Sequence, residues 1–568
     1  MSEDLESIVW KYTLLNAFEH GGKAQTNSVM SMILGERSDL RQKAREISKI
    51  VSNLVEKVNA MSIDDQKKEI EKLGIKIESK KEGKEEEEKT LPPLPNAEIG
   101  KVVTRFAPNP DFVIHIGNAR PAILSYEYSK IYKGKMILRF EDTDPRTKTP
   151  IKEAYNLIRE DLKWLEVIPD EEYIQSLRMN LFYDVAKEII KNGCAYVDKS
   201  GDEGKKLLSK QMEPPDRNTS PEKNLEEFDK MINNYYKEGE AILRIKTDVT
   251  HPNPSIRDWI AFRIIDTSSY PHPLVGDKYV TWPTYNFAVS VDDHLLGITH
   301  VLRGKEHELN TMKQEYIYKC LKWKMPIYIH FGRLKLEGFI MSKSYIRKIM
   351  SENPKEFLGY DDPRFGTISG LRRRGILPES IKEVILEVGI KSGDAKLSWI
   401  NLASVNRKKL DPIADRLMFV ENPVKVSVEQ PTCLNAEIPL HPDAPNRKRS
   451  ISICNGDEIY VDEKDLNLKR FRLMELGNYE YKNGSLNFIN KDISYARKEK
   501  LQIIQWVPHK EFKEILIREP YGLQFKDHKG VVENYINNYN KGSRLQFLRF
   551  GFIIIDNIDP LIGFLTHK

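Results

Sequence analysis

The stretch Ala107-Pro-Asn-Pro-Asp-Phe-Val-Ile-His115-Ile-Gly117-Asn118 follows an apolar-rich run, Lys101-Val-Val-Thr-Arg-Phe106. The run predicts a strand over 102–106, and the residues after the stretch predict a helix over 119–132. The histidine and the glycine therefore fall where a strand turns into a helix. Because a helix N-terminus offers free backbone N–H groups and a partial positive charge, this position favours a phosphate.

The residues around this stretch alternate between strand and helix patterns. A strand over 135–140 and a helix over 152–165 come next, and the sheet is expected to resume with strands over 287–291 and 297–303. Such alternation predicts an α/β protein with a parallel, doubly wound sheet. Sheets of this kind bind ligands beyond the carboxyl ends of their strands, which is where His115 falls.

A second stretch, Ile340-Met-Ser342-Lys343-Ser344, places a lysine between two hydroxyls on an expected loop. Such a lysine can bring a mobile positive charge over a triphosphate, and preorganised charge is the main catalytic device of phosphoryl-type transfers. Each motif is weak by itself, since a lone His-Ile-Gly is more often a buried turn and a lone Met-Ser-Lys-Ser a surface loop. Their joint occurrence favours a nucleotide site, and the absence of Gly-x-x-x-x-Gly-Lys-[Ser/Thr] excludes a P-loop.

Composition sets looser bounds. The 568 residues suffice for several domains, and a net charge of +5 permits a nucleic-acid partner without requiring one. The four cysteines lie far apart with no Cys-x-x-Cys pair, so we expect neither zinc nor a disulfide framework. An acidic N-terminus without a signal core, and no apolar run long enough to span a bilayer, predict a cytoplasmic protein that does not enter membranes.

The two motifs together resemble those of the class I aminoacyl-tRNA synthetases, with His115-Ile-Gly117-Asn118 as the HIGH signature and Met341-Ser342-Lys343-Ser344 as the KMSKS signature. More narrowly, the chain resembles the archaeal and eukaryotic glutamyl-tRNA synthetases from about residue 100 to its end. The segments that carry this resemblance are Thr104-Arg-Phe-Ala-Pro-Asn-Pro110, Leu138-Arg-Phe-Glu-Asp-Thr-Asp-Pro145, Pro283-Thr-Tyr285, Val291-Asp-Asp-His-Leu-Leu-Gly-Ile-Thr-His-Val-Leu-Arg303, Asp362-Pro-Arg364 and Ile504-Gln-Trp-Val-Pro508.

This resemblance implies a Rossmann-like catalytic sheet with further domains attached. The expected divisions are a helical extension (1–78), a charged and proline-rich linker (79–99), the two halves of the catalytic domain (100–175 and 285–334), an acceptor-stem insertion between them (176–284), a helical domain (335–420) and all-β anticodon-binding barrels (421–568). Short strands are expected in the last region over 424–428, 449–453, 458–461, 501–507 and 547–555.

The resemblance also implies roles for particular residues. His115 and Lys343 would be catalytic, and ATP, accompanied by Mg²⁺, would be held by Ala107, Asn109, His115, Gly117, Asn118, Ser342, Lys343 and Ser344. The α-carboxylate of L-glutamate would attack ATP to give glutamyl-adenylate, and tRNA would then accept the glutamyl group. We expect no metal site formed by the protein itself.

Arg303 is expected to choose the amino acid. A guanidinium pairs bidentately with a carboxylate, and the glutaminyl relatives carry a small uncharged residue at this place. Arg105, Glu141 and Tyr285 would complete the glutamate site. The plainer alternatives are a surface ion pair from Arg303 to a nearby glutamate, a core position for Tyr285, and a capped turn at Glu141.

The expected partners are tRNA(Glu), with tRNA(Gln) left open, together with L-glutamate and ATP, and the chain is expected to act as a monomer. Arg372, Arg373 and Arg374 would reach tRNA phosphates, or else form a solvated helix face. Glutaminyl-tRNA synthetase, a non-catalytic tRNA-binding paralogue and a small-molecule nucleotidyltransferase stay as alternatives.

Two departures from the family pattern stand beside the nucleotide site. Asn118 replaces the second histidine of the HIGH signature, and an amide cannot carry its charge. The segment Asp111-Phe112-Val113 replaces the usual glycine-containing stretch, and it places an acid beside a triphosphate site, for which the sequence offers no reason.

Overall fold

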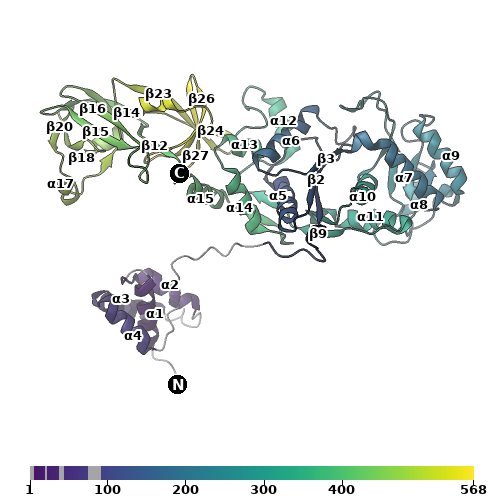
Figure 1. The fold of residues 1–568 in the computed structure, drawn as a ribbon, viewed down its shortest axis with the longest axis horizontal. Coiled ribbons are helices and arrows are strands. Elements are labelled where there is room, and N and C mark those ends of the chain that lie inside the picture. Colours follow the sequence, from purple (N-terminus) through teal and green to yellow (C-terminus); the bar gives the residue numbers. More distant parts are fainter. Residues whose placement is uncertain (1–4, 20–21, 37–43, 74–90) are drawn as a thin grey trace. The chain divides into compact units, whose positions relative to one another are not determined.

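The computed structural model describes residues 5–19, 22–36, 44–73 and 91–568 (Figure 1). The chain divides into two compact units, Met1–Thr90 and Leu91–Lys568. Residues 79–90 of the expected linker lie outside the described residues. None of the described helices is long and apolar enough to cross a bilayer.

The described residues of the first unit form helices joined by short turns. They are α1 (Leu5–Glu19), α2 (Thr26–Glu36), α3 (Ala44–Ala60) and α4 (Ile63–Lys72). In α3 the apolar residues Ile47, Val51, Leu54 and Val58 recur every three or four positions and so share one buried face. These side chains pack with residues of α1 and α2 in a core of their own.

The catalytic sheet begins with three parallel strands in the order β1–β2–β3. Their bounds are β1 (Val103–Phe106), β2 (Lys135–Phe140) and β3 (Glu171–Ile174), joined by α5 (Ile116–Ile131) and α6 (Lys152–Trp164). Apolar side chains of α5 and α6 pack on the sheet around Leu124, Tyr128 and Leu138. The elements predicted over 102–165 are therefore confirmed to within three residues at each end.

A second parallel pair continues this sheet. Strands β8 (His300–Gly304) and β9 (Ile327–Phe331) run side by side, and the Thr299 N–H donates to the Val103 carbonyl beside β1 at 2.9 Å. The prediction of a strand over 287–291 is wrong, because these residues lie in helix α10 (Tyr285–Leu295). Residues 286–293 are all buried, so polar and apolar residues do not separate into an exposed and a buried face that would reveal the helical period.

The insertion between the two halves is an antiparallel sheet covered by helices. Its strands are β4 (Ala195–Asp198), β5 (Ile242–Ile245), β6 (Ile260–Ile264) and β7 (Thr281–Pro283), and its helices are α7 (Met179–Lys191), α8 (Asp202–Ser209) and α9 (Pro221–Ile232). The insertion shares one core with α10 and with α11 (Glu308–Leu321), and the rings of Phe262 and Phe287 lie 4.6 Å apart. The insertion is thus packed onto the second half of the catalytic domain.

A mostly helical segment carries the second motif. It contains β10 (Leu334–Leu336), α12 (Lys343–Glu352), α13 (Ile368–Arg373), α14 (Pro378–Val388), β11 (Ala395–Leu397) and α15 (Trp399–Leu410). Short 3-10 helices occur at Gln175–Arg178, Pro215–Asn218, Lys305–His307 and Asn534–Asn538.

The C-terminal region is built on two seven-stranded sheets. The first has the order β12 (Asp415–Leu417), β25 (Arg544–Phe547), β26 (Gly551–Ile558), β27 (Leu561–His567), β23 (Phe512–Tyr521), β24 (Gln524–Glu533) and β13 (Phe419–Val420). The second has the order β21 (Ile503–Ile504), β18 (Arg470–Leu473), β19 (Gly477–Lys482), β20 (Ser485–Asn490), β14 (Pro423–Glu429), β17 (Glu458–Asp462) and β22 (Trp506–Pro508). A hairpin of β15 (Leu434–Pro439) and β16 (Lys448–Ile453) and the short helices α16 (Glu463–Leu466) and α17 (Ile493–Lys498) complete it. Each sheet encloses its own apolar core, which agrees with the predicted barrels.

The cysteines correct one expectation from the sequence. Cys194 is bonded to Cys320, and Cys433 to Cys454, so the prediction that no disulfides form is wrong. The fold brings partners together that are 126 residues apart in the first pair, whereas the second pair lies at the ends of the β15–β16 hairpin. Closing so long a loop restricts the unfolded chain and stabilises the fold by roughly 3–5 kcal/mol.

Candidate functional site

A cleft of about 1080 Å³ opens beyond the carboxyl ends of β1, β2 and β8. Every residue predicted to hold ATP or glutamate lines it. These residues are Arg105, Ala107, Asn109, His115, Gly117, Asn118, Glu141, Tyr285, Arg303, Ser342, Lys343 and Ser344. The fold therefore gathers segments that are more than two hundred positions apart into one cleft, although their individual roles stay predictions.

His115 is the N-cap of α5. Its Nδ1 accepts hydrogen bonds from the N–H groups of Gly117 at 3.1 Å and Asn118 at 3.3 Å. Burial, reinforced by the nearby charge of Lys343, lowers the pKa of His115 to about 4. The imidazole is therefore neutral at physiological pH, and because Nδ1 accepts, its proton sits on Nε2. His115 thus offers the cleft an N–H donor without a charge.

Gly117 makes room for this histidine. A Cβ at Gly117 would lie 2.9 Å from Cε1 of His115 and 3.0 Å from the carbonyl oxygen of Leu334. Both contacts are closer than carbon atoms normally tolerate, and the carbonyl belongs to the β10 backbone, which cannot move freely. A glycine is therefore required here by contacts within the protein, to His115 and Leu334, rather than by contact with a ligand.

Replacing Gly117 with alanine is expected to displace the His115 ring and to weaken ATP binding about tenfold, which is the effect of losing one good hydrogen bond to a charged group. Equilibrium binding of ATP measures the effect. Gly393→Ala is the matched control, because a Cβ at Gly393 would meet nothing within 4 Å. Equal ATP affinity for G117A and the wild type would contradict the assigned geometry.

Asn118 uses its backbone rather than its side chain within the motif. Its N–H donates to His115, while the residue itself is exposed at the cleft. The departure from the usual histidine therefore changes an exposed side chain and leaves the N-cap of α5 intact.

Arg303 lies at the other end of the cleft as a buried cation with neutral partners. It is 4% exposed, and its Nη2 donates to Thr311 Oγ1 at 2.6 Å and to Gln314 Oε1 at 3.1 Å. The guanidinium lies over the ring of Tyr328, 4.6 Å from its centre. Burial and Arg303 itself lower the pKa of His307 to about 3, so that neighbour is neutral as well.

The alternative of a surface ion pair for Arg303 does not match these contacts. Among the described residues, no carboxylate lies within ion-pair distance of Arg303, and Glu306 instead pairs with the exposed Arg333 at 3.8 Å. A buried guanidinium without an anion is costly to maintain. The position therefore suits an anionic ligand.

A charged cluster joins Arg303 to the nucleotide end of the cleft. Arg139 contacts Asp293 at 2.6 Å and Glu141 at 2.9 Å, and Arg105 contacts Asp293 at 3.4 Å. Burial alone would raise the pKa of Asp293, but Arg139 and Arg105 bring it below its usual value, so this carboxyl is ionised. Burial raises the pKa of Glu141, although Arg139 and Arg105 oppose the shift. Together with Arg303 the cluster holds three guanidinium groups against two carboxyl groups, so at least one positive charge is uncompensated when both carboxyls are ionised.

The remaining predicted glutamate ligands border this cluster. The Tyr285 hydroxyl lies 3.2 Å from Nδ1 of His307 and accepts from Arg303 Nη1 at 3.4 Å, so the side chain is at the cleft wall rather than wholly in the core. Asp144, and not Glu141, caps the turn that follows β2, accepting from the Thr147 N–H at 3.0 Å. Glu141 is therefore free of the turn role considered for it.

Sequence reasoning missed several residues of this pocket. They are Arg139, Asp293, His307, Thr311, Gln314, Tyr328 and His330. A signal was present for two of them, since Arg139 interrupts the apolar run of its strand and Asp293 lies, with Asp292, in a wholly buried part of its helix. Charged residues in such buried elements need a partner, which here they find in each other.

Arg372, Arg373 and Arg374 lie outside the cleft. Arg373 donates to Asp556 at 2.8 Å and to Asp361 at 3.0 Å. Arg374 is 7% exposed and lies 4.0 Å from the centre of the Trp399 ring. These surroundings indicate structural roles for Arg373 and Arg374, which leaves a phosphate contact as a prediction for Arg372 alone.

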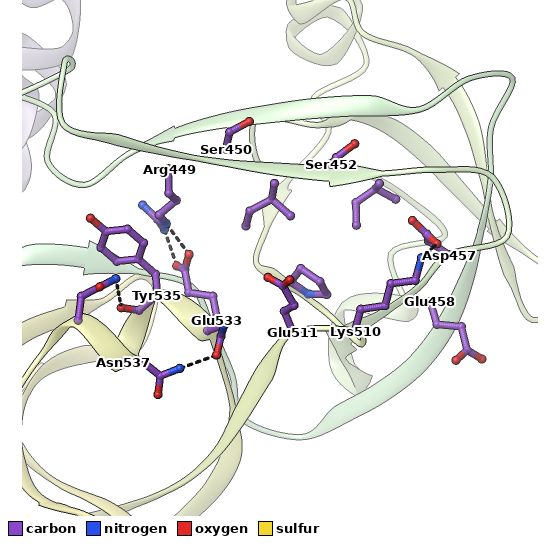
Figure 2. A pocket seen from close by; sticks show the side chains of 15 residues that line it. Arg449, Ser450, Ser452, Asp457, Glu458, Lys510, Glu511, Glu533, Tyr535 and Asn537 are labelled. Atoms are coloured by element: carbon purple, nitrogen blue, oxygen red, sulfur yellow. Dashed lines mark hydrogen bonds and ion pairs between the residues drawn. The ribbon is translucent and has the colours of Figure 1, made fainter.

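A second cavity, of about 510 Å³, lies in the C-terminal region (Figure 2). Strands β16 and β17 line it together with the segment that follows β24. Arg449 pairs with Glu533 at one end, and Lys510 pairs with Asp457 at the other (Figure 2). Ser450 and Ser452 line the cavity between these pairs.

No group of three or more His, Cys, Asp or Glu side chains that could hold a metal ion occurs within residues 5–568 where the structure describes them.

Comparison with known proteins agrees with this architecture. Residues 101–412 match the family described as tRNA synthetases class I (E and Q), catalytic domain, and residues 414–498 match its anti-codon binding domain. The chain belongs to the class I tRNA synthetases of the E and Q family. The catalytic match contains both motifs and all the cleft residues named above.

Individual members of this E and Q family align along the whole chain. A glutamate–tRNA ligase of Aeropyrum pernix is 55% identical and covers 100% of both chains. Those of Hyperthermus butylicus, at 50% identity over 96% of this chain and 97% of the relative, and of Pyrococcus furiosus, at 48% identity over 100% of each, are similar as well. A solved glutamate tRNA ligase from Elizabethkingia meningosepticum covers 55% of this chain and 70% of its own at 22% identity, with a TM-score of 0.40.

Proposed function

We propose that the protein is an enzyme that attaches L-glutamate to tRNA(Glu) by way of glutamyl-adenylate. The observation that carries this proposal is the buried Arg303, which has no anionic partner among the described residues and lies in the same cleft as the nucleotide motifs. The names of the full-length relatives, glutamate–tRNA ligase, support the same reaction.

In the first step, an oxygen of the glutamate α-carboxylate attacks the α-phosphorus of ATP, and the bond to the β-phosphate breaks to release pyrophosphate. The carboxylate is already a nucleophile, so no side chain has to remove a proton. The Nε2–H of His115 and the ammonium of Lys343 would stabilise charge on the phosphate oxygens. Positioning and charge neutralisation would thus account for catalysis.

In the second step, a terminal ribose hydroxyl of tRNA attacks the acyl carbon of the adenylate, and AMP leaves. The insertion over 176–284 would hold the acceptor end of the tRNA, and the C-terminal sheets would hold the anticodon end. The polar cavity shown in Figure 2 is of a size that admits an unstacked base. We further propose that the enzyme acts as a cytoplasmic monomer.

Mg²⁺ would enter this cleft with ATP. The described residues offer no carboxylate cluster for it. Mg²⁺ keeps several water ligands and often binds mainly through substrate phosphates. An ion that arrives bound to ATP would therefore need few ligands from the protein.

Selection of glutamate follows from the charge of the pocket. The γ-carboxylate would neutralise the one uncompensated positive charge beside Arg303, whereas the amide of glutamine would leave it. Rejection of glutamine is therefore expected to be worth about 3–5 kcal/mol. His307 adds no further positive charge to the pocket, because its pKa is about 3.

The decisive experiment is ATP–pyrophosphate exchange with tRNA present, measured with glutamate and with glutamine. Exchange with glutamate alone supports the proposal, and preference for glutamine overturns it in favour of a glutaminyl-tRNA synthetase. Tight tRNA binding without any exchange would instead indicate a non-catalytic paralogue. Charging purified tRNA(Glu) and tRNA(Gln) side by side then decides whether the enzyme also acts on tRNA(Gln).

A further inference from the structure

The segment Asp111-Phe112-Val113 joins the two motifs. The Asp111 carboxylate accepts a hydrogen bond from the ammonium of Lys343, the lysine of the second motif. The Asp111 side chain is 7% exposed, whereas that of Lys343 is 46% exposed. The acid beside the triphosphate site is therefore the resting partner of the catalytic lysine.

The two residues after Asp111 anchor this arrangement. Phe112 and Val113 are buried in an apolar cluster with Ile346 and Ile349 of α12, the helix that begins at Lys343. The ring of Phe112 also lies 5.2 Å from that of Tyr360. The packing fixes the backbone at Asp111, so its carboxylate has a defined place.

Lys343 can leave that place without breaking the cluster. A lysine carries its charge at the end of a flexible four-carbon stem, and both Asp111 and Lys343 line the nucleotide cleft. The ammonium can therefore exchange the carboxylate for a phosphate oxygen by side-chain rotation while α12 stays packed against Phe112 and Val113.

We propose that Asp111 is a positioning residue that holds Lys343 at the edge of the cleft until ATP arrives and takes it back when pyrophosphate leaves. The inference rests on the proposed function, because it needs ATP as the ligand of this cleft. A triphosphate attracts the ammonium more strongly than one carboxylate does, so ATP wins the exchange. Asp111 competes with pyrophosphate for the same ammonium, so recapture of the lysine by Asp111 favours the release of pyrophosphate.

Two consequences follow. The ion pair makes Lys343 unavailable for part of the time, so the affinity for ATP is lower than the isolated site would give. The same competition weakens the binding of pyrophosphate. Removing the carboxylate is therefore expected to tighten both ligands about tenfold, the effect of losing a partly exposed, charge-assisted hydrogen bond.

The experiment is a double-mutant cycle on the full chain, with the binding of ATP and of inorganic pyrophosphate measured at equilibrium. The variants are Asp111→Asn, Lys343→Ala and the two combined. The amide introduced by D111N preserves the shape of the side chain but removes its negative charge. We expect D111N to tighten both ligands about tenfold in the wild type and to change neither in the K343A background.

Three outcomes separate the possibilities. An equal gain in the K343A background would overturn the proposal, since removal of a negative charge near phosphate would then explain it without the lysine. No gain in the wild type would overturn it as well. Failure of the wild type to bind ATP at all would instead overturn the proposed function. Thermal unfolding of each variant checks that it folds.

Discussion

Arg303→Gln is expected to lower kcat/KM for glutamate by roughly 10²- to 10³-fold, because truncating one partner of a buried charge pair costs several kcal/mol. The glutamine side chain removes the positive charge but keeps a polar amide at this position. Glutamate would then bury its γ-carboxylate without a cation. Discrimination against glutamine should shrink in the same variant, because the charge that rejects an amide is gone.

Steady-state pyrophosphate exchange with both amino acids measures this prediction. Arg159→Gln is the matched control, since Arg159 is partly exposed and pairs with Glu172 at 2.6 Å outside the cleft. The control should keep wild-type activity. If R303Q kept both its rate with glutamate and its preference over glutamine, Arg303 would not be the carboxylate ligand.

Lys343→Ala is expected to slow adenylate formation by roughly 10²- to 10³-fold, the range seen when one preorganised donor to a developing charge is removed. The loss should appear in the KM for ATP as well as in kcat. The ammonium leaves Asp111 for a phosphate oxygen when ATP binds, and this interaction strengthens further as charge develops.

Single-turnover formation of the adenylate isolates this step from tRNA charging. Lys348→Ala is a suitable control, because Lys348 lies on the same helix α12 with a side chain that is 66% exposed. A K343A enzyme as fast as K348A would show that the second motif acts in binding or folding and not in the chemistry.

The sequence predicted the elements whose ends are marked by charged or turn-forming residues. Strand β2 was placed at its observed bounds although Met136–Phe140 are all buried, since this mostly apolar run ends at such residues. Helix α10 was mistaken for a strand, because burial on all sides removes the period on which such a prediction depends. The disulfides were missed for a related reason: the separation of two cysteines along the chain does not give their distance in the fold.

The cleft residues were predictable because short motifs carry them. His115 and Lys343 stand in recognisable patterns, and the parallel sheet brings such patterns to one edge. The charge balance of the pocket was not predictable, because Arg139 and Asp293 are 154 residues apart and only the fold pairs them. The burial of Arg374 was not predicted. Three successive arginines look alike in the sequence, although in the fold one of them stacks on Trp399.

The bond between Cys194 and Cys320 has a mechanical consequence for the insertion. The insertion is joined to the catalytic domain by the chain at its two ends. With these two connections alone it could rotate as a rigid body about a hinge through them. The disulfide adds a third attachment, from the start of β4 to α11, next to the apolar core that both sides share. With the disulfide formed, the insertion and the glutamate pocket are therefore held in a fixed relative position. After reduction of the disulfide, only the packing of the shared apolar core would hold them so.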